Sequence, residues 1–329
     1  MLLVGDVGAT KTDLAIYTSG SSPHSPVARR QFHSADYASL QAVVIEFLAE
    51  VRTRVNHATF DVAGPVIEKS VVTTNLPWVM DEDSLSTDLK LKSVHLMNDL
   101  EAVARAIPIL QKSDVVTLNT GEPISETAIG VIAPGTGLGE SFLAWNGSRY
   151  VAHGSEGGHA DFAATEIGQI RLLEYMLTRF AHVSVERVCS GIGIPYIYEY
   201  LRDVGHLHDA PEVTQQIASA KDRTKVIIDA AVYRHRESQL SRATIEMFVS
   251  ILGNEAGNLA LKVLATGGIY LAGGIALRTL PVLQEPAFMR AITNKGRFSE
   301  LMKRIPIHVI TTNAALVGAA AFAIENVTD

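Results

Sequence analysis

The chain lacks the residues and patterns that mark several classes of protein. Its 329 residues include one cysteine, Cys189, so an intramolecular disulfide and a cysteine zinc cluster are both excluded. No run of five or more basic residues occurs and the formal net charge is −7, which argues against a nucleic-acid partner because such binding needs clustered cations. No charged leader precedes the first apolar segment. The most apolar later stretch, 314–324, is shorter than the about 20 residues that span a bilayer, so we expect a cytoplasmic protein without a membrane partner.

The composition supports well-filled globular cores. Hydrophobic residues make up 47% of the chain and charged residues 19%, unlike a disordered chain. A chain of this length is typical of about two domains.

Strands alternate with helices along the sequence. Residues 2–17 are predicted to form two strands around a Gly- and Thr-rich turn, and 128–145 repeat this format. Apolar positions at helical spacing predict helices within 37–55 and 242–265. The remaining predicted strands are 58–66, 69–75, 94–98, 269–276 and 305–310, and the remaining predicted helices begin near 99, 166, 195 and 315. The order indicates a duplicated α/β architecture, with one domain of 1–110 plus 312–329 and a second of 111–311.

Two glycine-rich turns have the composition of phosphate-binding hairpins. In DVGATKT (6–12), Gly8 brings the backbone close to a ligand, Thr10 offers a hydroxyl, Lys11 a cation, and Asp6 a carboxylate for the water shell of Mg²⁺. In PGTGLGE (134–140), Gly135, Thr136 and Gly137 repeat the format. A single such turn is also typical of an ordinary tight hairpin. LAGGIA (271–276) adds a further backbone opening at Gly273 and Gly274, suited to a base or ribose.

Neither turn matches the standard nucleotide motifs. The spacing G-x-G-x-G in 135–139 differs from the dinucleotide fingerprint, and SFLAW, which follows, reads as a strand rather than a helix. The Walker A pattern is absent from the chain.

Acidic residues outside the hairpins have two interpretations each. Asn98 and Asp99 lie where a helix begins, so either is a suitable cap, and Asp99 is also a candidate base. Glu186 suits a helix start or a salt bridge. A metal site could be drawn from His153, Glu156 and His159, but these residues lack the helical H-E-x-x-H spacing.

Taken together, the motifs resemble those of the bacterial-type glucokinases, within the superfamily of sugar kinases, hexokinases and actin-like ATPases. The matching stretches, in family order over nearly the whole chain, are GDVGATKTDLAIY, TTNLPW, LMNDLEAVARAIP, APGTGLG, GSEGGHADF, HVSVERVCSGIG, YLAGGIALR and NKGRF. The resemblance implies a two-lobed, duplicated ribonuclease-H-like fold with an interlobe cleft. It also implies phosphorylation of D-glucose to glucose 6-phosphate with ATP and Mg²⁺, in glycolysis, by a homodimer.

The resemblance also implies a role for each candidate residue. Glucose hydroxyls would be held by Asn98, Asp99, Glu156, His159 and Glu186, with Asp99 as the base on the 6-hydroxyl. The two hairpins would bind the phosphates of ATP, and Gly273 and Gly274 would border the adenosine.

Departures and rivals remain. Ala9 stands where the common form of the first hairpin has a glycine. Glu140 places a carboxylate beside a phosphate loop, and the two interpretations open for it are a contact to a Mg²⁺-bound water and a structural pair. The phosphoryl donor could be ATP, ADP or polyphosphate. A kinase for mannose, fructose or N-acetylglucosamine is the nearest rival, and an actin-like ATPase is another. For a sugar-sensing regulator, a strand starting at residue 2 leaves no room for an N-terminal DNA-binding domain.

Overall fold

The computed structural model describes residues 1–64, 66–72, 76–234 and 237–326. It divides into two compact units, each described by itself: unit 1 comprises Met1–Gln111 with Thr312–Asp329, and unit 2 comprises Lys112–Thr311. Within the TTNLPW stretch, residues 73–75 lie outside the described part of the chain.

Unit 1 is built on a five-stranded sheet in the order β3-β2-β1-β4-β7. The first three strands are antiparallel, whereas β4 and β7 run parallel to β1. A small separate ribbon pairs β5 with β6. The strands are β1 Leu2–Val7, β2 Lys11–Tyr17, β3 Ala28–His33, β4 His57–Val62, β5 Ser70–Val72, β6 Val79–Asp81 and β7 Ser93–Asn98.

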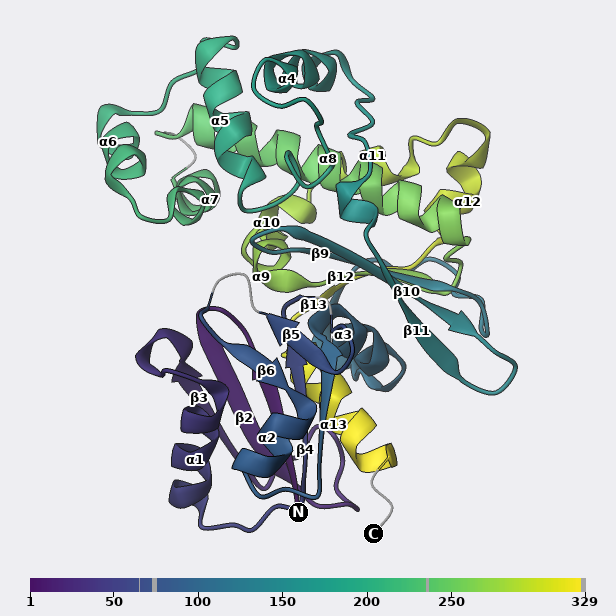
Figure 1. The fold of residues 1–329 in the computed structure, drawn as a ribbon. Helices are drawn as coiled ribbons and strands as arrows, with labels where there is room; N and C mark the ends of the chain where they lie inside the picture. The colour runs from purple at the N-terminus through teal and green to yellow at the C-terminus, as the bar shows by residue number, and fades with distance from the viewer. Residues whose placement is uncertain (65, 73–75, 235–236, 327–329) are drawn as a thin grey trace. The chain divides into compact units, whose positions relative to one another are not determined.

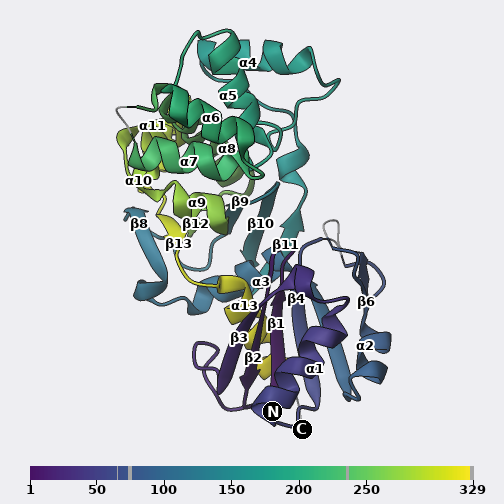
Figure 2. The ribbon, with the colours of Figure 1, turned by 90° about the vertical axis from the view of Figure 1, so that its left-hand side faces the viewer.

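Helices cover both faces of this sheet (Figure 2). One face packs against α1 and α2 through the cluster that contains Phe47 and Leu85. The other packs against α3 and α13 through a cluster rich in alanine. Alternating strand residues therefore supply two cores, which explains why the strands are apolar on both sides. The helices are α1 Leu40–Val51, α2 Glu82–Asp88, α3 Asp99–Ala106 and α13 Ala314–Asn326.

Unit 2 repeats the sheet plan. Its six strands have the order β11-β10-β9-β12-β13-β8, in which β9 to β11 form antiparallel hairpins and β12 and β13 are parallel to β9. The edge strand β8 is antiparallel to β13 and has no counterpart in unit 1. The strands are β8 Val115–Asn119, β9 Ile129–Pro134, β10 Leu138–Trp145, β11 Tyr150–Ser155, β12 Gly268–Leu271 and β13 Ile307–Ile310.

A long buried helix, α8, organises the helical part of unit 2, with α4, α5, α7 and α11 gathered around it (Figure 1). Fifteen of its residues are buried, so this helix is a core element rather than an amphipathic surface helix. The helices are α4 Ile167–Leu177, α5 Gly193–Asp203, α6 Pro211–Ser219, α7 Arg223–Tyr233, α8 Gln239–Val263, α9 Gly273–Arg278, α10 Leu280–Leu283, α11 Pro286–Thr293 and α12 Ser299–Arg304.

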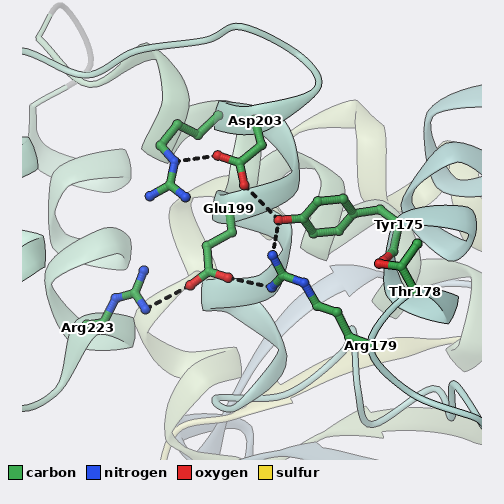
Figure 3. Close-up of polar contacts among 7 residues, drawn as sticks. Tyr175, Thr178, Arg179, Glu199, Asp203 and Arg223 are labelled. Carbon is green, nitrogen blue, oxygen red and sulfur yellow. Dashed lines mark hydrogen bonds and ion pairs between the residues drawn. The ribbon is translucent and has the colours of Figure 1, made fainter.

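A polar network joins three of these helices at the surface (Figure 3). Glu199 of α5 accepts hydrogen bonds from Arg179, which follows α4, at 2.7 Å and from Arg223 of α7 at 3.0 Å. The hydroxyl of Tyr175 donates to Asp203 at 2.9 Å. Each carboxylate here is matched by a guanidinium or a hydroxyl, so we read the network as structural.

The predicted α/β class and the duplicated ribonuclease-H-like plan are confirmed, since both sheets place antiparallel hairpins beside parallel strands. Several element boundaries differ from the prediction; for example, the strand expected over 58–66 ends at Val62. The strand expected over 269–276 ends at Leu271, because Gly273 opens a helix. Helix α8, expected within 242–265, begins at Gln239 and ends at Val263, where Leu264 takes the left-handed cap position.

Candidate active site

The first hairpin of unit 1 is closed by its own backbone and held by a serine from outside it. The Gly8 amide donates to the Lys11 carbonyl at 3.0 Å. The Ser34 hydroxyl donates to the Gly8 carbonyl at 2.7 Å, and the Ser34 amide donates to the Thr10 carbonyl at 3.0 Å. The side chains of Thr10 and Lys11 are exposed, so both are free to meet a ligand. Ser34 was missed by sequence reasoning because it lies 22 residues beyond this turn, after β3.

Asp6 lies at the end of β1, beside an asparagine from the other end of the chain. The Asn313 amide donates to Asp6 at 2.9 Å and to Asp13 at 3.3 Å. Arg29 donates to Asp13 at 3.0 Å and so neutralises that carboxylate. Burial raises the pKa of Asp6, whereas the hydrogen bond from Asn313 opposes the rise. A partly buried carboxylate at this position suits a nearby cation.

A further carboxylate, Asp61, was not anticipated. It stands beside Asp6 in the parallel pairing of β1 and β4 and is fully buried. Burial first, and then the Asp6 and Asp99 carboxylates, raise the pKa of Asp61 well above its usual value. The signal in the sequence is an aspartate within the apolar strand ATFDVAG, where a buried partner or a functional site is the usual reason for a charge.

The cap of α3 is Asn98, one of the two residues that the sequence offered as caps. The Asn98 side-chain oxygen accepts the amides of Leu100 at 2.9 Å and Glu101 at 3.3 Å. Its side-chain nitrogen donates to the Gly64 carbonyl at 3.0 Å. Because its oxygen serves the helix, Asn98 keeps one N–H for any ligand.

Asp99 is the first residue of α3, and its neighbour Asn98 is the residue that caps the helix. Its carboxylate accepts the Leu100 amide at 2.9 Å. Burial raises the pKa of Asp99 to about 6, although the Leu100 amide opposes the rise. A carboxylate with this pKa is ionised at neutral pH and is a stronger base than an exposed aspartate.

In unit 2, the second hairpin is packed against neighbouring backbone. The Gly135 amide donates to the Gly137 carbonyl at 2.8 Å and closes the turn. The amides of Gly191 and Ile192 donate to the carbonyls of Gly135 at 2.8 Å and of Thr136 at 3.2 Å. The Thr136 side chain remains exposed.

Glu186 joins this hairpin to the GSEGGHADF segment. Its Oε2 accepts the Leu138 amide at 2.9 Å, and its own amide donates to the Gly158 carbonyl at 2.9 Å. A Cβ at Gly137 would lie 2.3 Å from Oε2, and a Cβ at Gly158 would lie 2.2 Å from the Leu138 carbonyl oxygen. Glycine is therefore required at both positions for this close contact.

The structure brings three predicted sugar-binding residues of unit 2 together. His159 Nε2 lies 3.7 Å from Glu156 Oε2, and His159 Nδ1 lies 3.9 Å from Glu186 Oε1. The Glu156 and His159 side chains are 85% and 61% exposed, so they are available to a ligand. Within the described residues, no group of three His, Cys, Asp or Glu side chains is arranged to hold a metal ion, and His153 instead stacks on Phe142.

Gly273 and Gly274 begin α9 beside the same hairpin. Gly273 has φ +85°, and a Cβ there would lie 2.7 Å from the Pro134 carbonyl oxygen, so this position also requires glycine. Gly274 faces open space. Unit 2 thus gathers Gly135 to Gly137, Glu186 and the start of α9 in one place.

Comparison with known proteins agrees with this geometry. A family model described as Glucokinase matches residues 3–326. A glucokinase from Nostoc punctiforme is 39% identical over 333 residues, which cover 97% of this chain and 98% of that one. The crystal structure of a glucokinase from an Antarctic psychrotroph is 30% identical, covers 99% of both chains and has a TM-score of 0.84. A ROK-family glucokinase from Streptomyces griseus, solved with glucose and AMPPNP, shares the fold at 17% identity and a TM-score of 0.64, with 99% of both chains covered.

The duplicated sheets and paired glycine hairpins define a sugar kinase of the actin-like ATPase fold. Such an enzyme is a phosphotransferase. Within that class, the match over nearly the whole chain is decisive: the chain belongs to the glucokinase family.

Proposed function

We propose that the chain transfers the γ-phosphoryl group of ATP to the 6-hydroxyl of D-glucose, with Asp99 as the base. The observation that carries the proposal is the Asp99 carboxylate, which is not the N-cap of its helix and has a pKa raised to about 6. Phosphoryl transfer needs alignment, charge neutralisation and a base that accepts the proton of the nucleophile. The proposal requires that Asp99 of unit 1 and the sugar-binding groups of unit 2 reach the same glucose.

The pH dependence of kcat follows from this assignment. Asp99 must be ionised to accept the proton, so activity should fall as the pH drops through about 6. Below that value kcat should decrease by about tenfold per pH unit. A pH profile of kcat under saturating substrates measures this limb, and a flat profile down to pH 5 would contradict the role of Asp99.

The sugar is held by a polar ring in the proposal. Glu186, Glu156 and His159 accept or donate to glucose hydroxyls, and Asn98 contributes its remaining N–H. Glu186 is supported best, because the hairpin amide at Leu138 fixes its carboxylate. A sugar that lacks a matching hydroxyl leaves these groups unpaired and binds more weakly.

The phosphates are proposed to bind the backbone of the hairpins at Gly8 to Lys11 and at Gly135 to Gly137. The exposed Thr10 and Thr136 hydroxyls and the Lys11 ammonium supply further donors. Backbone amides aimed at developing charge stabilise the transferred group. Gly273 and Gly274 would border the adenosine.

Magnesium is proposed to be held near Asp6 through water. The donor set fits, because Asp6 is an oxygen ligand whose burial raises its pKa, and a cation would offset that cost. Mg²⁺ is commonly bound by one or two carboxylates together with substrate phosphates. When bound, it supplies charge neutralisation on the phosphates.

A coupled assay with glucose and MgATP tests the proposal. We expect turnover with glucose to exceed that with mannose, fructose or N-acetylglucosamine, and ATP to exceed ADP and polyphosphate. Preference for another hexose would assign a different kinase of this class, and the absence of turnover with every donor would overturn the proposal.

Family membership further supports a cytoplasmic homodimer that acts in glycolysis. Among the described residues, no helix combines the length and the apolar character needed to cross a membrane. Light scattering on the purified protein should give twice the 35.4 kDa mass of the chain. A mass equal to that of one chain would contradict the dimer.

A further inference from the structure

We propose that Glu140 is a positioning residue for the sugar: a neutral carboxyl that seats the turn carrying Glu156 and His159, and that loosens the turn when it ionises. The inference rests on the proposed function for its effect on glucose. Its effect on stability is independent of any substrate.

Glu140 is buried where two strands end near the candidate site. It is the last residue of PGTGLGE and lies on β10, where it pairs with Ile132 of β9 and Ser155 of β11. The residue is 1% exposed, and its Oε1 has no hydrogen-bond partner in the part of the chain that the structure describes. An ionised carboxylate in this setting would lack compensation.

The carboxyl of Glu140 occupies the space beneath Gly157. A Cβ at Gly157 would lie 2.0 Å from Glu140 Oε2 and 2.8 Å from its Cδ. The Gly157 amide donates to the hydroxyl of Ser155 at 3.0 Å, so the cross-strand partner of Glu140 holds the same residue. Gly157 links Glu156 to the 3-10 turn Gly157–His159. The Glu140 carboxyl therefore packs against the turn that carries the two exposed sugar-binding candidates, Glu156 and His159.

Of the charged groups around Glu140, Glu255 disfavours its ionised form and Lys262 favours it. Glu255 of α8 is also buried and accepts from Lys262 at 3.2 Å and from Asn258 at 2.9 Å. The Lys262 ammonium is thus already paired. The buried Cys189 thiol supplies no charge, since burial, Glu255 and Glu140 raise its pKa well above the usual value.

The consequence is a change of charge near neutral pH. Burial is the main reason that the pKa of Glu140 is raised to about 7; the Glu255 carboxylate adds to the rise and the Lys262 ammonium opposes it. Above that pH the Glu140 carboxyl at Gly157 becomes negatively charged, in addition to Glu255. The ionised carboxylate is then stabilised by moving towards water. Movement of the Glu140 carboxylate displaces the turn, and with it Glu156 and His159, from the sugar.

Glu140→Gln and Glu140→Ala separate charge from shape. Glutamine keeps the volume and neutrality of the protonated acid, so its KM for glucose should match that of the wild type at pH 6.5. Between pH 7 and 8.5 the wild-type KM should rise by at least about threefold relative to that of Glu140→Gln, because only the protonated form seats the turn. Alanine removes the contact between the carboxyl and Gly157, so KM for glucose should rise at every pH while kcat changes less. Calorimetric titration with glucose provides the same comparison without turnover.

A double-mutant cycle tests the contact itself. Gly157→Ala should be disruptive in the wild type, because its Cβ meets the Glu140 carboxyl. In the Glu140→Ala background the space is empty, so Gly157→Ala should cost less there. Additive effects of the two substitutions would overturn the contact.

Thermal unfolding gives the readout that does not depend on glucose. Because the folded-state pKa of Glu140 lies above its unfolded value, its favourable contribution is present at low pH and is lost as the pH rises through about 7. The Tm of Glu140→Gln should therefore gain on that of the wild type between pH 5 and 8.5. Equal pH dependence of both proteins, or a KM for Glu140→Gln as high as that for Glu140→Ala at pH 6.5, would overturn the inference. Absence of glucose turnover in the wild type would instead overturn the proposed function.

Discussion

The two glycine hairpins share a strand-turn-strand format but are supported by different means. The hairpin of unit 1 is held mainly by side chains: the Ser34 hydroxyl bonds the Gly8 carbonyl and Asn313 bonds Asp6, while the Ser34 amide bonds the Thr10 carbonyl. The hairpin of unit 2 is held mainly by backbone, with Gly191 and Gly158 packed directly on it, and by one side chain, that of Glu186, which accepts the Leu138 amide. Duplication thus supplied one scaffold twice, and the groups packed behind each turn decide its chemistry. Unit 1 places the buried Asp61 beside Asp6, whereas unit 2 presents the exposed Glu156 above the buried Glu140.

The largest expected effect concerns the partly buried Asp99 carboxylate of unit 1. Asp99→Asn keeps the shape of the side chain and the Asn98 cap but cannot accept the proton. We expect kcat to fall by about 10²–10⁴-fold with little change in folding. Steady-state kinetics and circular dichroism measure the two effects, and a near-normal rate would show that the base is elsewhere.

The corresponding carboxylate of unit 2 should affect binding more than chemistry. Glu186→Gln retains one acceptor for the Leu138 amide but loses the charge that would face a hydroxyl. We expect KM for glucose to rise by about 10–100-fold, as for loss of a charged hydrogen bond. An unchanged KM would remove Glu186 from the sugar site and leave it as a support for the hairpin.

The backbone support of the second hairpin can be tested with a matched pair of glycines. Gly158→Ala places a Cβ 2.2 Å from the Leu138 carbonyl oxygen, whereas a Cβ at Gly154 meets nothing within 4 Å. Gly158→Ala should lower the free energy of unfolding by about 1–3 kcal/mol, as overpacking does. Gly154→Ala is the control, and chemical denaturation of both compares them. Equal stabilities would mean that the hairpin tolerates separation from this segment.

The smallest expected effect concerns Asp61. Its folded-state pKa is raised, so the wild type loses stability as the pH rises above the usual aspartate value. Asp61→Asn removes this loss, so its Tm should exceed that of the wild type by more at pH 8 than at pH 4. A Tm difference that is constant with pH would mean that Asp61 is ionised over the whole range from pH 4 to 8. The buried Asp61 of unit 1 would then have an ordinary pKa, like an exposed carboxylate such as Glu156 of unit 2.

Local patterns were enough to predict most of the elements in both sheets. The hairpins at 2–17 and 128–145 and the long helix α8 follow from periodicity and glycine placement. The edge strands β3, β8 and β11 were missed, because most of their residues are exposed or only partly buried and lack a clear alternation.

The supports of the candidate site depend on residues distant in sequence. Asn313 meets Asp6 across 307 positions, and Ser34 meets the first hairpin only after β3 has folded back. The close approach of Gly158 to Leu138 likewise depends on how two loops pack. Motifs indicate which groups carry chemistry, whereas tertiary packing determines which groups hold them.

The helix α13 has a consequence for how the protein is made. It packs so tightly on α3 that a Cβ at Gly318 would lie 1.8 Å from the Ala102 carbonyl oxygen, yet it is translated after the whole of unit 2. During synthesis on the ribosome, one apolar face of the unit 1 sheet is therefore covered only in part, by α3, while some 200 residues emerge. Asn313, which bonds Asp6, emerges with the same helix. The nascent chain therefore gains this bond beside the first hairpin and its protection from aggregation in a single late step.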